Sequence, residues 1–265
     1  MTSLMNDQKS AELARSAAIR LLKAAEDATA TGATVLAEKQ TVFPPAYSWW
    51  RLICRTSEGV MQLLDAGFTV EVAPLMRNIF NHAYALHWLV DNGEPALGAL
   101  VALGDEAREK LYNKLAATGW PNAAEYRKAM DEYAAQRVTI TRTPAEETLH
   151  NKLKHELGNV HDMLDRYGSP ELYPVYAHLS GLSHTSIFTA SAYVERMDDG
   201  AYQIRPTAES LGYADIIQLA LALLQAALVM SPLLDGDPLR SDINKVMQDF
   251  GLEGAQLLPN RAKGK

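Results

Sequence analysis

The sequence has 265 residues and only one cysteine, Cys54, so it cannot form an internal disulfide. Trp50, Leu52 and Ile53 lie beside this cysteine and indicate a buried, unreactive thiol. A chain without disulfides suits a reducing compartment. The first 22 residues also lack the charged start and uninterrupted apolar run of a secretory signal. We therefore expect a cytoplasmic protein.

Basic residues are few as well. The chain has 25 Lys and Arg against 32 Asp and Glu, for a net charge of −7. Proteins that hold duplex DNA by its phosphates carry the opposite balance. We therefore expect no binding of duplex DNA, and an RNA partner would have to contact a small local basic patch.

Long apolar runs are limited to Ile216–Met230, about 15 residues interrupted by Gln218 and Gln225, whereas a bilayer needs about 20. We interpret this run as a buried core helix and expect no membrane partner. Cysteine clusters and phosphate-binding glycine loops are missing too, and His155 and His161 are six residues apart, too far for an HExxH zinc site. We therefore expect no metal and no cofactor.

Alanine and leucine dominate the rest of the chain, and apolar positions recur every three or four residues, which predicts an all-α, mostly antiparallel multi-helix bundle. We expect one domain over 1–265, with a core at about 44–195, C-terminal helices at 207–250 and a tail at 251–265. Glycine and proline, which fall at segment ends, delimit the expected helices: 7–29, 44–67, 69–91, 95–118, 121–137, 144–167, 170–179, 180–194, 207–230 and 238–250. Asp199-Gly200, between two short alternating arms, predicts a β-hairpin near residues 193–205.

The helix expected at 69–91 carries two different faces. On a helical wheel one stripe is mostly apolar, whereas Arg77, Asn81, Tyr84 and Trp88 form a second, polar and aromatic stripe. Each of these side chains can donate a hydrogen bond, and together they are typical of one wall of a cleft. The structural alternative is that Arg77 pairs with Glu58 or Gln62 on the preceding helix.

A second polar stripe lies in YPVYAHLSGLSHTS, where Tyr173, Tyr176, Ser180 and His184 follow at spacings of three, four and four. If Gly181 does not break the helix, these residues share one inward face within reach of Arg77. The histidine could donate, accept or carry a proton. The alternative is an ordinary structural histidine.

LLDAGFTVEVAPLMRNIFNHAYALHWLV, followed later by YPVYAHLSGLSHTS, resembles a bacterial family of helical domains of unknown function, grouped with abortive-infection and HEPN-like domains. That family combines an Arg-x-x-x-Glu helix with a later Tyr…Ser…His helix. Arg77, Tyr173, Ser180 and His184 fit this pattern, whereas Asn81 stands where the family has Glu.

HEPN ribonucleases are known for Arg, a polar residue, and then His four to six residues after the Arg; Arg77, Asn78 and His82 match. The resemblance implies a metal-independent RNA-cleaving protein, related to defence or toxin systems. His82 would transfer protons, Arg77 would stabilise the charge on the phosphorane, and Asn78 would orient the pair. Because residues five apart differ by 140° on a helix, Arg77 and His82 converge only if the arginine wraps round or a second subunit of a homodimer supplies one of them.

The alternative function comes from a different class. In it, the chain is a non-catalytic helical module that binds a protein partner or small ligand in a cleft. That cleft would be lined by residues of both stripes: Arg77, Asn81, Tyr84, Trp88, Tyr173, Tyr176, Ser180 and His184.

Overall fold

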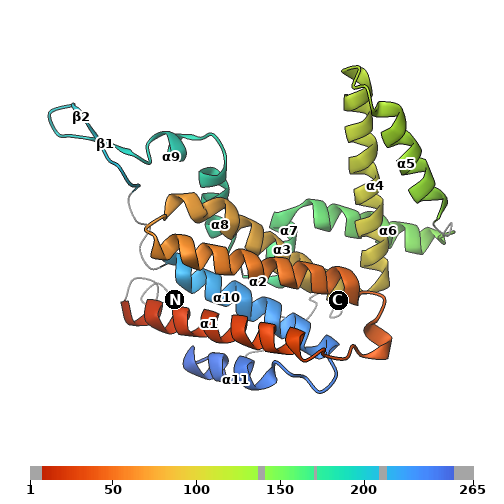
Figure 1. Ribbon diagram of the computed structural model, residues 1–265, viewed down its shortest axis with the longest axis horizontal. Coiled ribbons are helices and arrows are strands. Elements are labelled where there is room, and N and C mark those ends of the chain that lie inside the picture. The colour runs from red at the N-terminus through yellow and green to blue at the C-terminus, as the bar shows by residue number, and fades with distance from the viewer. Residues whose placement is uncertain (1–7, 137–140, 170–171, 209–213, 254–265) are drawn as a thin grey trace. The chain divides into compact units, whose positions relative to one another are not determined.

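The computed structural model describes residues 8–136, 141–169, 172–208 and 214–253 and confirms an all-α fold with one short hairpin (Figure 1). The α-helices are α1 (Gln8–Ala30), α2 (Phe43–Asp65), α3 (Ala73–Asn92), α4 (Glu94–Ala117), α5 (Ala123–Ala135), α6 (Pro144–Gly158), α7 (Val160–Tyr167), α8 (Leu172–Ser183), α9 (Ile187–Ala190), α10 (Ala214–Met230) and α11 (Arg240–Asp249). Short 3-10 turns are η2 (Ala37–Lys39), η3 (Val70–Val72) and η4 (Ser231–Leu233). The expected tail at 251–265 lies mostly outside the described residues.

The chain divides into two compact units, Met1–Asp91 with Val160–Lys265, and Asn92–Asn159. The second unit is thus an insertion in the first, although the sequence has no linker-like segment at either junction. Compact units need not fold independently, so the single-domain expectation stays a prediction.

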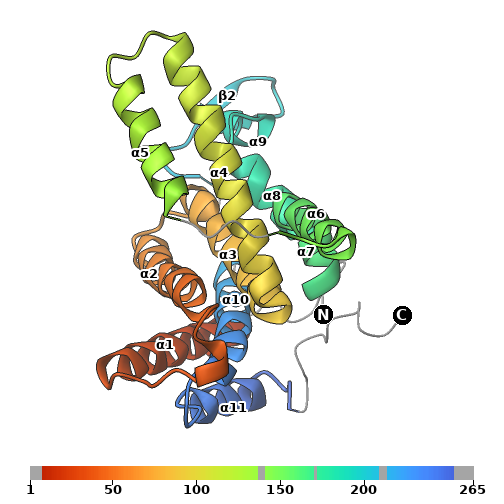
Figure 2. The same cartoon turned by 90° about the vertical axis from the view of Figure 1, so that its right-hand side faces the viewer.

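The first unit is built around α10. This helix packs against both α1 and α2, and α11 packs on α1 (Figures 1 and 2). The buried side of α1 consists of alanines and Leu21, and short side chains let two helices approach closely. The segment Ala214–Leu233 is long and apolar enough to cross a bilayer, yet 78% of its apolar stretch is buried in the fold, as expected for a core helix.

The second unit consists of α4, α5 and α6, with α4 packed against each of the other two. A capping box starts α6: the Thr143 hydroxyl accepts from the Glu146 backbone, and the Glu146 carboxylate accepts from the Thr143 backbone. The expected single helix at 144–167 is wrong. It breaks at Asn159, whose extended backbone separates α6 from α7.

The boundary expected at residues 179 and 180 is also wrong. Helix α8 continues through Gly181 to Ser183, and a second capping box, made by Ser186 and Thr189, starts α9. Gly181 does not end the helix; its missing side chain leaves room for the ring of Phe188, 2.8 Å from where a Cβ would lie.

The β-hairpin is confirmed. Strands β1 (Val194–Arg196) and β2 (Tyr202–Ile204) pair antiparallel, with Val194 opposite Ile204. At its tip Gly200 has a φ of +83°, a left-handed conformation that glycine adopts without strain. In Figure 1 the hairpin projects away from α1, α2 and α10.

Candidate functional site

Arg77 and Tyr176 join the two predicted stripes. The Nε of Arg77, on α3, donates to the hydroxyl of Tyr176, on α8, over 3.2 Å. The guanidinium also lies over the Tyr176 ring, 5.5 Å from its centroid, at a distance typical of a cation–π contact. Tyr176 is buried and Arg77 is half-buried, so a fixed aromatic ring orients a partly accessible cation.

No carboxylate neutralises this arginine in the part of the chain that the structure describes. The expected pairing of Arg77 with Glu58 is wrong, because Glu58 pairs with Arg55 within its own helix at 2.5 Å. Gln62 makes no hydrogen bond to Arg77 either. The terminal guanidinium nitrogens of Arg77 therefore remain available as hydrogen-bond donors.

Asn81 lies one helical turn after Arg77 and is half-buried. Its side-chain oxygen is buried without a hydrogen-bond partner among the described residues. A buried polar atom of this kind costs free energy, and an incoming donor would relieve that cost. Asn81 thus adds an unpartnered acceptor one helical turn from Arg77.

His82 and Asn78 belong to another part of the helix surface. The Nδ1 of His82 donates to the Asn78 backbone carbonyl over 2.8 Å, because a carbonyl can only accept. The imidazole ring packs edge-on against Trp49 of α2, with 6.1 Å between ring centroids. The Asn78 side chain is exposed. Arg77 thus contacts α8 while His82 contacts α2, as their 140° separation predicts.

Tyr84 and Trp88 do not line a cleft. Trp88 is fully buried, and Tyr84 is 6% exposed. Burial raises the pKa of the Tyr84 hydroxyl well above its ordinary value. Both are core residues, because their side of α3 faces the interior of the unit.

The second stripe is only partly assembled. Tyr176 points inward and Ser180 is half-buried, but Tyr173 is 42% exposed and its ring packs edge-on against His161. His184 is exposed, because α8 ends at Ser183 and the helical spacing stops before this residue. The expectation of one inward face holding all four residues is therefore wrong.

A buried polar cluster surrounds His87 on α3 and was not predicted from the sequence. The side-chain amide of Gln225, on α10, lies 2.7 Å from His87 Nδ1 and donates to it. The imidazole packs on the Tyr167 ring at 4.6 Å, and the Tyr167 hydroxyl donates to Asp91 over 3.1 Å. Burial lowers the pKa of His87 to about 4, so the ring is neutral at pH 7. Gln225, one of the few polar residues in the mostly apolar helix α10, was the signal that such a partner exists.

Cys54 is buried as predicted. Desolvation raises the pKa of its thiol to about 12, which leaves it protonated and unreactive. Among the described residues, no group of three or more His, Cys, Asp and Glu side chains is arranged to hold a metal ion.

A model of a family of unknown function, DUF5677, matches residues 45–202, more than half of the chain. The chain belongs to the DUF5677 family. The matched segment contains the whole second unit and both predicted stripes. No curated protein and no solved structure matches the chain.

Proposed function

We propose that this DUF5677 protein is a helical module that binds an anionic ligand, a phosphate or a carboxylate, at the Arg77–Tyr176 pair. The observation that carries the proposal is an oriented, half-buried arginine without an acidic partner among the described residues. Arg55, by contrast, is paired with the carboxylate of Glu58.

The geometry suits this task. The Tyr176 hydroxyl accepts from the Nε of Arg77, and the face of the Tyr176 ring contacts the guanidinium. The planar guanidinium therefore loses little rotational freedom when a ligand binds. The two terminal nitrogens then form a fork that matches two oxygens of one anion. The unpartnered Asn81 oxygen would accept from a ligand hydroxyl or ammonium group.

RNA cleavage, together with kinship to HEPN-like domains, is the competing proposal. One observation favours it: because the Nδ1 of His82 donates to Asn78, a neutral imidazole keeps Nε2 as a free proton acceptor. Within one chain, however, Arg77 and His82 contact different helices. RNA cleavage therefore needs a homodimer in which a second copy brings His82 to Arg77.

The test uses inorganic phosphate and pyrophosphate as probes, with chloride at matched ionic strength as the reference. Ligand binding to the folded state raises the melting temperature. We expect this rise in the wild type and in Arg55→Ala, an exposed control, and its loss in Arg77→Ala. Tyr176→Phe, which keeps the ring and removes the hydroxyl, should weaken the response several-fold. Equal responses in Arg77→Ala and the wild type would contradict the proposal.

A parallel assay distinguishes the competing proposal, RNA cleavage, from anion binding. The same proteins are incubated with single-stranded RNA in EDTA, and cyclic-phosphate products are measured. Cleavage that disappears in both Arg77→Ala and His82→Ala would replace the binding module by a ribonuclease. The Arg77→Ala protein should still fold, because the hydrogen bond from the charged guanidinium that it loses is worth about 1.5–3 kcal/mol and its removal leaves no carboxylate unpaired.

A further inference from the structure

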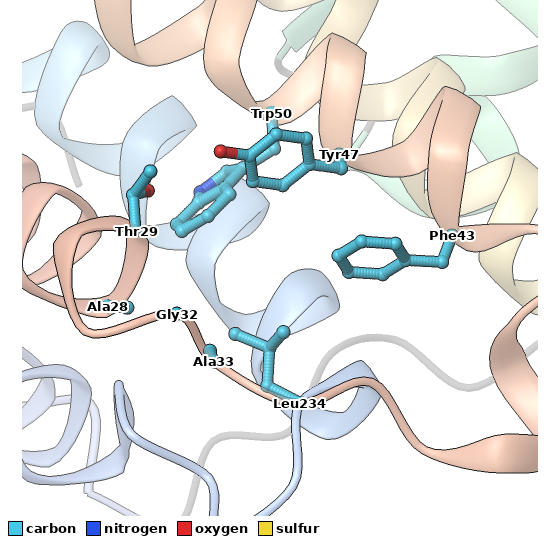
Figure 3. Close-up of a pocket in the computed structure, with 8 residues that line it drawn as sticks. All are labelled: Ala28, Thr29, Gly32, Ala33, Phe43, Tyr47, Trp50 and Leu234. Atoms are coloured by element: carbon cyan, nitrogen blue, oxygen red, sulfur yellow. The ribbon is translucent and has the colours of Figure 1, made fainter.

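A cavity of 190 Å³ opens in the first unit, between the end of α1 and the start of α2. Figure 3 shows the rings of Phe43, Tyr47 and Trp50 on one side and Leu234 facing them. The last turn of α1 and the residues after it complete the lining: Ala28, Thr29, Gly32 and Ala33. No side chain in this set carries a charge.

The three aromatic rings come from one face of α2, at spacings of four and three residues. Phe43 and Tyr47 are stacked with their centroids 5.5 Å apart, and Trp50 meets Tyr47 edge-on at 6.0 Å. Trp50 is buried, whereas Phe43 and Tyr47 are half-buried. The rings therefore support one another and still border an open space.

The opposite wall is held in place by backbone hydrogen bonds. Gly32 closes α1 with a φ of +69°, and the amides of Gly32 and Ala33 donate back to Thr29 and Ala28. The following segment bonds to the segment after α10: Leu36 N donates to Leu233 O over 3.1 Å. Asp235 N likewise donates to Thr34 O over 2.8 Å. The cavity thus exists before any ligand arrives.

The electrostatics of this cavity favour a positive ligand. Aromatic faces carry negative potential and attract cations, most strongly when the cation is weakly hydrated. In the described part of the chain no Lys or Arg lies over these three rings. Other rings do have such a contact: an arginine guanidinium lies over each of Tyr176, Tyr133 and Tyr112.

We propose that this cavity binds a small organic cation with a methylated ammonium head. The volume is close to the roughly 150 Å³ that accommodates a benzene-sized guest in a protein core. A primary ammonium would lose strong hydrogen bonds to water, and no lining carboxylate replaces them, whereas a quaternary head has no N–H to satisfy. This site is distinct from Arg77, whose charge selects anions.

The experiment compares choline and tetramethylammonium with 3,3-dimethylbutan-1-ol, the uncharged isostere of choline. Binding is measured by calorimetry and by the indole NMR signal of Trp50. We expect saturable binding of both cations and at least tenfold weaker binding of the isostere. Equal affinity for choline and the isostere would show an ordinary apolar cavity and overturn the proposal, as would no binding of either cation.

Substitutions of the aromatic residues that line the cavity test whether choline binds there. Tyr47→Leu and Phe43→Leu keep apolar volume and remove the ring, so each should weaken choline binding at least fivefold and change isostere binding little. Phe68→Leu, an exposed aromatic outside the cavity, is the matched control. Circular dichroism and melting temperature verify the fold of each variant.

Choline binding in the cavity should be independent of phosphate binding at Arg77. Arg77→Ala should leave choline binding unchanged, and Tyr47→Leu should leave the phosphate response unchanged. If Tyr47→Leu and Phe43→Leu both bind choline like the wild type, the cation binds elsewhere and the assignment is wrong.

Discussion

At the scale of single residues, burial decides which predicted side chains can act. Arg77 and Tyr84 share one stripe of α3, yet Arg77 keeps accessible donors while Tyr84 is enclosed in the core. His87, outside that stripe, is also perturbed by burial: its pKa falls to about 4 because a charged imidazole would lose hydration. Such a group makes stability depend on pH.

The sign of that dependence follows from proton linkage. Between about pH 6.5 and 4 the unfolded chain binds a proton at His87 and the folded chain does not, so stability falls as the solution is acidified. His87 alone contributes a loss of about 2 kcal/mol in the free energy of unfolding between about pH 7.5 and 5, and urea unfolding measures it as the difference between the wild type and a variant that lacks this histidine.

The variant His87→Gln isolates the contribution of His87 to the pH dependence of stability. Asp215 works in the opposite direction, because burial raises its pKa to about 6 and protonation on acidification favours the folded state. His87→Gln should remove only the His87 part of the pH dependence, so its unfolding free energy approaches that of the wild type as the pH falls. His184→Gln, at an exposed histidine, should leave the pH dependence as it is. A His87→Gln profile parallel to the wild type would contradict the assignment.

At the scale of elements, the site depends on how α7 and α8 are held against α3. The turn between α7 and α8 passes beside Tyr84 at Gly168. A Cβ added there would lie 2.8 Å from both the Leu164 carbonyl oxygen and Leu172 Cδ1, and 3.3 Å from the Tyr84 ring. Only glycine fits, because one obstacle is backbone and cannot rotate away.

Gly168→Ala should therefore destabilise the protein by about 2 kcal/mol, as overpacking of a filled site does. It should also weaken the phosphate response, because α8 carries Tyr176. The matched control is Gly59→Ala, within α2, where a Cβ meets nothing within 4 Å. That change should stabilise by about 0.5–1 kcal/mol through helix propensity. Denaturant melts of both variants check the opposite signs, and a stable Gly168→Ala protein would show that the turn can move.

At the scale of the whole molecule, the second unit, Asn92–Asn159, is inserted into the first. Its two junctions are close together: α7 has eight residues, about 12 Å of helix, and its last residue, Tyr167, donates to Asp91 at the other junction. The core around α10 and the Arg77–Tyr176 pair both belong to the first unit.

Replacing residues 92–159 by a Gly/Ser linker of about eight residues, long enough for this gap, should leave a helical first unit that unfolds cooperatively. It should keep the phosphate response of the full chain, because no residue of the proposed anion site is removed. Circular dichroism, urea unfolding and the phosphate titration measure this. Loss of cooperative unfolding would show that the two units form one domain.

Much of this architecture could be predicted because its causes are local. Helical periodicity, Pro44-Pro45 at the start of α2 and Asp199-Gly200 in the hairpin all act within a few residues. The stripe containing Arg77 could be recognised for the same reason. Local signals did fail where tertiary packing competes with them, as at Gly181, which is retained inside α8 because Phe188 fills the space beside it.

The partners of each side chain were decided only by tertiary structure. Arg77 meets Tyr176, 99 residues later, instead of Glu58, because the rotation and offset of packed helices select the contact. Leu234 faces the aromatic rings of α2 across some 190 residues of sequence for the same reason. Helix periodicity determines which residues share a face, but it carries no information about what that face will touch.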